Sequence, residues 1–176
     1  MYQYYKIARD KAWECLIESK VNTLPLNLKE IFNYYDIKLK TFINSDDEAF
    51  IKNNIVYFNK SINFKRVRFT LAHELGHILL NHENLTHTIH TYNGIEEYQA
   101  NIFSRCLLMP AIVLKEINYI ETQGIANICD VPLQAAEYRS QRLKQLLKRN
   151  KFYTSQLERK VYNNFKNFID KNPIFW

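Results

Sequence analysis

Residues 67–80 read VRFTLAHELGHILL, and this stretch decides the fold. Its apolar residues recur at intervals of three and four, which is typical of a helix with one face toward a core. The apolar stripe comprises Val67, Leu71, Leu75, Ile78 and Leu79. We therefore expect a largely buried helix that starts after Ser61.

This helix carries the pattern His-Glu-x-x-His, at His73, Glu74 and His77. Histidines four residues apart lie about 40° apart in projection and one turn apart in height, so both imidazoles reach one ion. Glu74 projects near the same ion without having to bind it, and can take a proton from a water that attacks a carbonyl. The pattern predicts a zinc-peptidase site in which His73 and His77 bind Zn²⁺ and Glu74 is the catalytic base.

A catalytic zinc ion normally has three protein ligands and one open position, so a third ligand is needed. A third histidine at metzincin spacing is disfavoured, because Glu83 occupies that position. Glu96 and Glu97 open the next predicted helix and are the candidates. We choose Glu97, because Asn101 lies one turn later on the same face and could hydrogen-bond the outer nitrogen of a ligand histidine.

All five histidines lie between positions 73 and 90. His82, His87, His90 and Tyr92 are therefore candidates to stabilise an oxyanion or to protonate a leaving amine. We interpret each of them as a surface residue of the polar stretch 81–94 and leave them out of the predicted site.

The rest of the chain predicts an α+β domain that is mainly helical and zincin-like. Residues 37–42, 50–51 and 55–58 form short apolar or alternating runs, which indicate a small antiparallel sheet packed on the motif helix, with a turn at Asn53-Asn54. Further helices are expected over residues 4–20, 27–35, 96–109, 111–119, 123–129, 132–148 and 154–169. We assign residues 1–150 to a metallopeptidase domain and residues 151–176 to a C-terminal amphipathic helix packed on it.

Composition favours a soluble protein. Hydrophobic residues make up 47% of the chain, and no apolar run approaches the roughly 20 residues that span a bilayer. The first residues do not resemble a secretory signal, so we expect a cytoplasmic protein without a membrane partner. Cys15, Cys106 and Cys129 form no Cys-x-x-Cys pair, and we expect them to be reduced and buried.

The net charge of +6 is unevenly distributed. Residues 139–176 contain ten Lys and Arg residues against two acidic ones, so the preceding part of the chain is slightly acidic. Such asymmetry is found on solvated faces of basic helices, and also on surfaces that bind nucleic acid or an acidic partner. We favour solvated helix faces and keep direct nucleic-acid binding as the alternative.

Three blocks of sequence resemble the ImmA/IrrE family of metallopeptidases. They are FTLAHELGH at residues 69–77, Glu97-x-x-Ala100-Asn101-x-Phe103, and Leu107-Leu108-Met109-Pro110. The similarity extends over residues 55–110 and is looser over 120–143. It implies a gluzincin-like domain that holds zinc through His73, His77 and Glu97, with Glu74 catalytic.

The resemblance also implies a cytoplasmic protein of bacteria, phages or mobile elements that cleaves helix-turn-helix repressors and so releases silenced genes. Gln99 and Ser104 differ from common family residues, but neither is a predicted ligand. Residues 123–143 echo a helix-turn-helix rhythm, although such segments in this family more often pack on the peptidase domain. We predict a zinc-dependent endopeptidase that acts on a repressor; the alternative is a non-catalytic, metal-containing regulator that binds DNA or sequesters a repressor.

Overall fold

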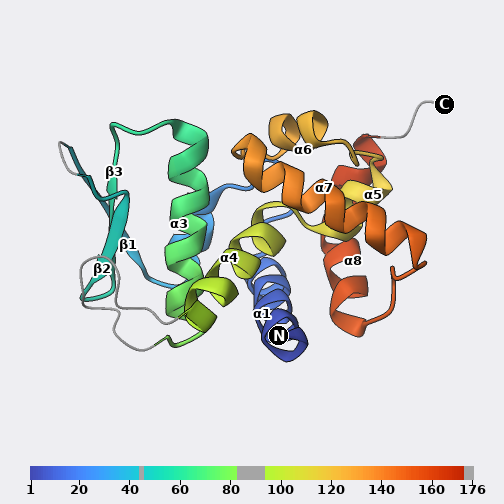
Figure 1. The fold of residues 1–176 in the computed structure, drawn as a ribbon, viewed down its shortest axis with the longest axis horizontal. Helices are drawn as coiled ribbons and strands as arrows, with labels where there is room; N and C mark the ends of the chain where they lie inside the picture. The colour runs from blue at the N-terminus through green and yellow to red at the C-terminus, as the bar shows by residue number, and fades with distance from the viewer. Residues whose placement is uncertain (44–45, 83–93, 173–176) are drawn as a thin grey trace.

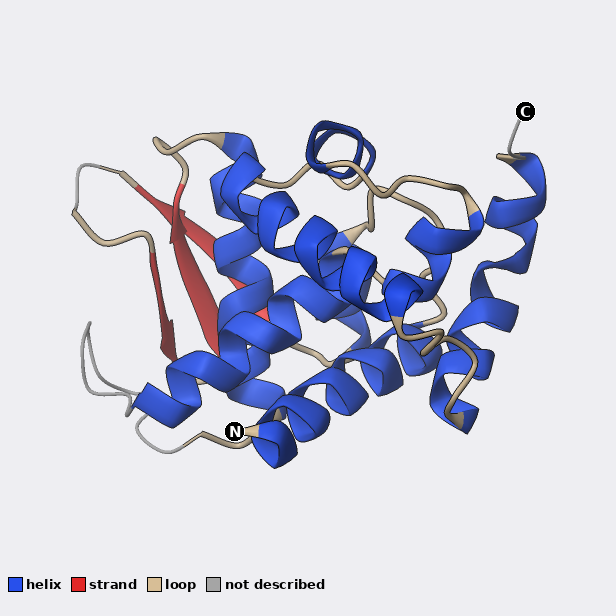
Figure 2. Cartoon of the chain, turned by 45° about the vertical axis from the view of Figure 1, so that its right-hand side comes forward, coloured by secondary structure: helices blue, strands red, loops and turns tan. Residues whose placement is uncertain are grey.

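A computed structural model describes residues 1–43, 46–82 and 94–172, which are mainly helical (Figure 2). The elements in chain order are α1 (Tyr2–Ser19), α2 (Leu28–Tyr34), β1 (Lys38–Phe42), β2 (Ala49–Lys52), β3 (Ile55–Asn59), α3 (Phe64–Leu79), α4 (Gly94–Leu108), α5 (Ala111–Glu116), α6 (Thr122–Ile128), α7 (Leu133–Lys148) and α8 (Gln156–Lys171). This arrangement confirms the predicted mainly helical α+β fold with a small sheet. No helix in the described ranges has the length and apolar character needed to cross a bilayer.

The β2–β3 hairpin forms as its turn residues predict. The strands run antiparallel, with Ile51 opposite Val56. Asn53 and Asn54 between them have φ angles of 51° and 57°. Positive φ at both central positions is typical of a two-residue type I′ turn, and asparagine tolerates that conformation better than most residues.

The sheet is mixed rather than wholly antiparallel, which corrects the expectation for β1. The strand order is β1-β3-β2, and β1 runs parallel to β3 with Leu39 opposite Val56. Phe42 at the end of β1 and Ala49 at the start of β2 lie at the same end of β3, so β3 inserts between the other two strands. Apolar alternation defines the buried face of a strand, but it does not specify the order of strands in the sheet.

Helix α3 lies between the sheet and helix α4 (Figure 1). Its contact with α4 is close at Gly76, where a Cβ atom would lie 3.0 Å from Cδ1 of the fully buried Phe103. A glycine is needed here because a larger residue would push the two helices apart. The close approach brings the start of α4 beside the second half of α3.

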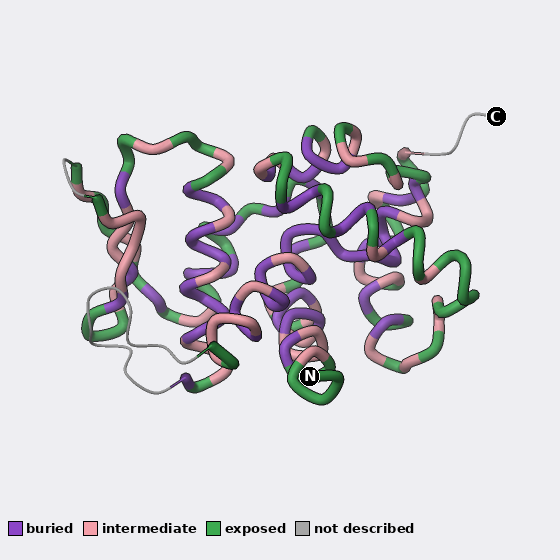
Figure 3. Tube along the Cα trace, in the orientation of Figure 1, coloured by how far each residue is buried: buried purple, intermediate pink, exposed green. Residues whose placement is uncertain are grey.

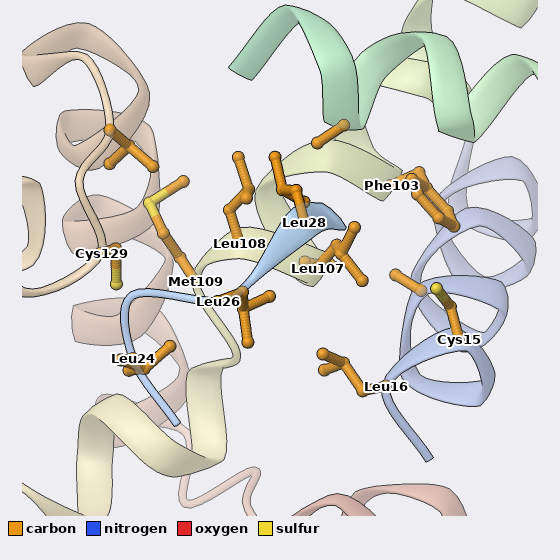
Figure 4. Close-up of a cluster of buried hydrophobic side chains, with 14 of the residues drawn as sticks. Cys15, Leu16, Leu24, Leu26, Leu28, Phe103, Leu107, Leu108, Met109 and Cys129 are labelled. Carbon is orange, nitrogen blue, oxygen red and sulfur yellow. The ribbon is translucent and has the colours of Figure 1, made fainter. Parts of the chain in front are cut away.

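The main core lies where α1, α4 and the segment before α2 meet. Figure 3 shows the buried residues concentrated along the inward faces of these helices, and Figure 4 shows side chains from all three segments in one cluster. Leu16, Leu26, Phe103 and Leu107 there are each at most 1% exposed. This packing holds α4 between α1 and α3, with Phe103 in contact with both the core and α3.

The C-terminal helices pack on the same helical body. Helix α8 contacts α1 and α5, and the Asn164 amide donates to the carbonyls of Leu16 (3.2 Å) and Val21 (3.0 Å). The Ser155 hydroxyl caps this helix by accepting from the Glu158 N–H. The division of the chain near residue 150 stays a prediction.

The turn between α6 and α7 is tied to helix α3. Arg68 is buried, and its guanidinium donates to the carbonyls of Asp130 (3.1 Å) and Leu26 (3.0 Å). Lys65 donates to the carbonyl of Ala126 at 3.1 Å. The segment with the helix-turn-helix rhythm is therefore anchored to the helix that carries His73 and His77.

Candidate metal centre

Three of the predicted side chains converge on one point. The Nε2 atoms of His73 and His77 on α3 lie 3.0 Å apart. Each lies 3.3 Å from a different carboxylate oxygen of Glu97, in the first turn of α4. Among the described residues, this is the group of histidine, cysteine and acidic side chains whose ligand atoms lie close enough together to share an ion.

The spacing of these atoms fits a divalent metal. Ligand atoms about 2.0–2.1 Å from a tetrahedral zinc ion lie about 3.3 Å from one another. The three separations in the structure are 3.0, 3.3 and 3.3 Å. Two imidazole nitrogens and one carboxylate form a donor set that suits zinc and leaves one tetrahedral position open.

The protonation states of Glu97 and His77 also favour metal binding. Hydrogen bonding with His73 and His77 lowers the pKa of Glu97, so its carboxylate is ionised. Burial lowers the pKa of His77, although the hydrogen bond with Glu97 opposes this shift. A neutral imidazole beside an ionised carboxylate is the protonation state that metal binding requires.

Glu74 lies in the same hollow as this group. The hollow has a volume of about 280 Å³, and its walls include His73, Glu74, Glu97 and Asn101. Glu74 is only 9% exposed, and burial raises its pKa to about 7, with added repulsion from the charges of Glu97 and Glu48 and opposition from His73. A carboxyl group with a pKa near neutrality can both take up and release a proton.

The wall of the hollow also includes a polar group that sequence reasoning missed. Glu48 accepts hydrogen bonds from the Thr70 hydroxyl (2.8 Å) and from Arg66 Nε (2.8 Å). Burial tends to raise its pKa, but these two hydrogen bonds lower it overall. Glu48 precedes β2, far from the motif in sequence, so no local pattern indicates its place.

His82 corrects the expectation of a surface loop residue. It is only 7% exposed, and its Nδ1 lies 2.9 Å from Nδ1 of His77. Asn81 has a φ of 54°, and the His82 and Asn81 N–H groups donate to the carbonyls of His77 and Ile78. This is a Schellman motif, which places the second residue after a helix cap against the last turn of that helix. The sequence signal for this motif is Asn81 directly after the apolar pair Leu79-Leu80, because asparagine tolerates the positive φ that the motif requires.

The other residues considered for the site fall into two groups. Asn101 lines the hollow, and its amide donates to the main-chain carbonyl of Glu97 at 2.8 Å, while His82 occupies the outer nitrogen of His77. A hydrogen bond from Asn101 to a ligand histidine stays a prediction. His87, His90 and Tyr92 lie outside the described residues.

Comparison with known protein families tests the family relationship that the three blocks of sequence indicated. Residues 27–141 match the model of the M78 peptidases, described as the IrrE N-terminal-like domain. The chain belongs to this family. The match covers both helices of the metal centre, so the IrrE-like domain includes His73, Glu74, His77 and Glu97.

A curated relative of this IrrE-like domain is the radiation response metalloprotease IrrE of Deinococcus radiodurans. The two sequences are 37% identical over 73 residues. The aligned part covers 38% of this chain and 22% of the relative, so the chain corresponds to a minor share of that protein.

Proposed function

We propose that this protein is a zinc-dependent endopeptidase. The observation that carries the proposal is the meeting of His73, His77 and Glu97 at metal-binding distances, with Glu74 in the same hollow. Membership of the M78 peptidase family supports it. A zinc ion held by the three side chains would supply Lewis-acid chemistry, polarising a peptide carbonyl and making a water molecule more acidic.

In this proposal each side chain has a separate task. His73, His77 and Glu97 hold the metal, and the fully buried His77 is oriented by His82. Glu74 is the general base: its carboxylate takes a proton from the attacking water and then gives that proton to the leaving amine.

We further propose that the substrate is a helix-turn-helix transcriptional repressor, and that cleavage induces genes of a phage, mobile element or stress response in the cytoplasm. The sequence resemblance of the three motif blocks to the ImmA/IrrE family supports this assignment. The name of the relative, a radiation response metalloprotease, is consistent with a regulatory role.

The direct test is incubation of the zinc-loaded protein with a purified candidate repressor, followed by mass spectrometry of the products. Wild type should cut the repressor at a defined bond. Glu74→Gln should retain zinc but cut about 10²–10⁴ times more slowly, which is the usual contribution of a general base.

The same experiment separates the enzyme from a non-catalytic regulator. A structural metal site needs no base at position 74. If wild type binds the repressor tightly and leaves it intact with zinc present, or if Glu74→Gln relieves repression as well as wild type, the endopeptidase proposal fails.

A further inference from the structure

Three hollows lie in a row from the metal centre along helix α4. The second, of about 130 Å³, shares Arg66, Phe69 and Asn101 with the hollow at the metal centre. The third, of about 400 Å³, shares Arg105 and Tyr138 with the second. Neighbouring hollows share lining residues, so the three hollows lie next to one another, beginning at the metal centre.

The third hollow, here called the distal pocket, is lined by arginines and tyrosines from α1, α4 and α7. Its arginines are Arg105, Arg139 and Arg142, and none of its lining residues is acidic. The Arg105 guanidinium lies over the ring of Tyr138, 4.9 Å from the centroid, and Arg142 lies 5.0 Å over the ring of Tyr5. Stacking on a ring holds each guanidinium in place. Arg105 Nε donates to the Asn101 carbonyl at 2.9 Å and Arg142 Nη1 donates to Gln145 at 3.2 Å, and their other N–H groups can donate to a ligand.

Among the described residues, the positive charge in the distal pocket is not balanced by a paired carboxylate. Across residues 1–43, 46–82 and 94–172, no carboxylate forms an ion pair with Arg105, Arg139 or Arg142. Arg139 is only 4% exposed, and the Nε atoms of Arg139 and Arg142 are buried without a hydrogen-bond partner in that part of the chain. The pKa of Arg105 is lowered mainly by burial and, to a smaller extent, by the positive charge of Arg139. Clustered, partly desolvated cations of this kind are stabilised when an anion binds.

We propose that the distal pocket binds an acidic side chain of the peptide substrate. This inference rests on the proposed endopeptidase function, because it makes the pocket part of the surface that binds the substrate. Arginine pairs with a carboxylate through two parallel hydrogen bonds, and the tyrosine rings cover the carbon chain of the bound residue. Two of the ten basic residues in 139–176, Arg139 and Arg142, would then face an acidic partner at this pocket.

The position of the acidic residue follows from the helix. Glu97 and Arg105 are eight residues apart on α4, which corresponds to about 12 Å. An extended peptide covers that distance in about four residues. The small hollow between the two sites is lined by Phe69, Pro132 and Ala135 together with polar side chains such as Asn101 and Gln134, and its volume accepts only a small side chain on the way.

The test uses a mixture of synthetic peptides of random sequence as the probe. The zinc-loaded protein is incubated with the mixture, and the cleaved products are sequenced by mass spectrometry. Wild type should enrich Asp and Glu at one position about four residues from the cut bond. Arg105→Gln and Arg142→Gln should each reduce that enrichment about tenfold or more, as expected for loss of a charged hydrogen bond.

The matched control is Arg149→Gln, which removes an equal charge from an exposed position at the end of α7, outside the distal pocket. It should cleave with the wild-type preference. Far-UV circular dichroism confirms that each variant is folded before comparison. Cleavage by wild type without an acidic preference, or a preference that survives in both pocket variants, overturns the inference.

A binding measurement separates this inference from the proposed function. Zinc-loaded Glu74→Gln protein is immobilised, and the peptides that it retains from the same mixture are sequenced. The Glu74→Gln protein should retain acidic peptides, and the double variant Glu74→Gln/Arg142→Gln should not. That result supports binding of an acidic side chain in the distal pocket, even if wild type cuts nothing and the endopeptidase proposal fails. Retention without any enrichment of Asp or Glu overturns the inference.

Discussion

His77 and His82 face each other through their Nδ1 atoms, 2.9 Å apart at a buried position. One Nδ1 must donate and the other must accept. Since Nε2 of His77 points at Glu97 and His73, donation from His77 Nδ1 leaves its Nε2 lone pair directed at the metal position. His82 is then the acceptor that selects this tautomer.

Replacing His82 should therefore weaken metal binding. His82→Leu removes the acceptor that faces Nδ1 of His77 and should lower zinc affinity about 10–100-fold, the usual effect of losing such a partner. His82→Asn supplies a side-chain oxygen and should retain most of the affinity. Competition with a chromogenic chelator measures both, and thermal unfolding of the metal-free proteins checks that the fold is intact. Equal affinities for wild type and His82→Leu would show that His82 does not orient His77.

The two adjacent glutamates at the start of α4 should differ in their effect on zinc. Glu97→Gln removes the carboxylate that contacts both histidines, so the bound zinc should fall well below one equivalent. Glu96→Gln is the matched control and should retain one equivalent, since Glu96 is not part of the converging group. Metal content per chain, measured on purified protein, distinguishes them. A loss confined to Glu96→Gln would move the third ligand to that residue.

Gly76→Ala should destabilise the protein despite the higher helix propensity of alanine. The added Cβ would lie 3.0–3.2 Å from three atoms of Phe103, which is fully buried and has no room to move. Overpacking of this kind costs about 1–3 kcal/mol, against a gain of about 1 kcal/mol from propensity. Urea unfolding should show a lower midpoint for Gly76→Ala. Gly94→Ala, where no atom of the described residues lies within 4 Å of the new Cβ, should unfold like wild type or later.

Glu48 should stabilise the fold at neutral pH and lose this effect in acid. Its folded-state pKa is lowered, since the hydrogen bonds from Arg66 and Thr70 outweigh burial. A lowered carboxyl pKa contributes stability above the unfolded-state value of 4.5, and this contribution disappears as the pH falls through the folded-state value. Glu48→Gln should thus be less stable than wild type at neutral pH, by no more than about 1 kcal/mol because the side chain is partly exposed. Urea titrations at several pH values should show the two proteins converging in acid; a gap that widens there would contradict the assignment.

The cysteines should react slowly in the folded protein. All three are buried and free, as expected from their spacing. Burial raises the pKa of Cys15 and of Cys129 to about 12, so at about pH 8 roughly one thiol in ten thousand is ionised. Iodoacetamide should label these two residues only after denaturation, as followed by mass spectrometry. Rapid labelling of either in the native protein would show that it is accessible.

Local features of this protein were predictable from the sequence. The apolar stripe of α3, the spacing of His73 and His77, and the turn at Asn53-Asn54 depend on residues a few positions apart. Helix periodicity and the φ preference of asparagine act over that range, so the pattern alone determines them. Glu97 could also be chosen from the sequence, because it lies in the first turn of the next helix and one turn before Asn101.

Features that join distant segments were decided by the tertiary structure alone. The insertion of β3 beside β1, the place of Glu48 in the wall of the metal centre, and the meeting of Arg105 with Arg139 and Arg142 leave no periodic trace in the sequence. Each depends on how whole elements pack, as the position of α4 depends on Gly76, which allows α4 to lie against α3. Local preferences determine which elements form and which faces are apolar; only the summed burial of those faces in one core selects which distant side chains meet.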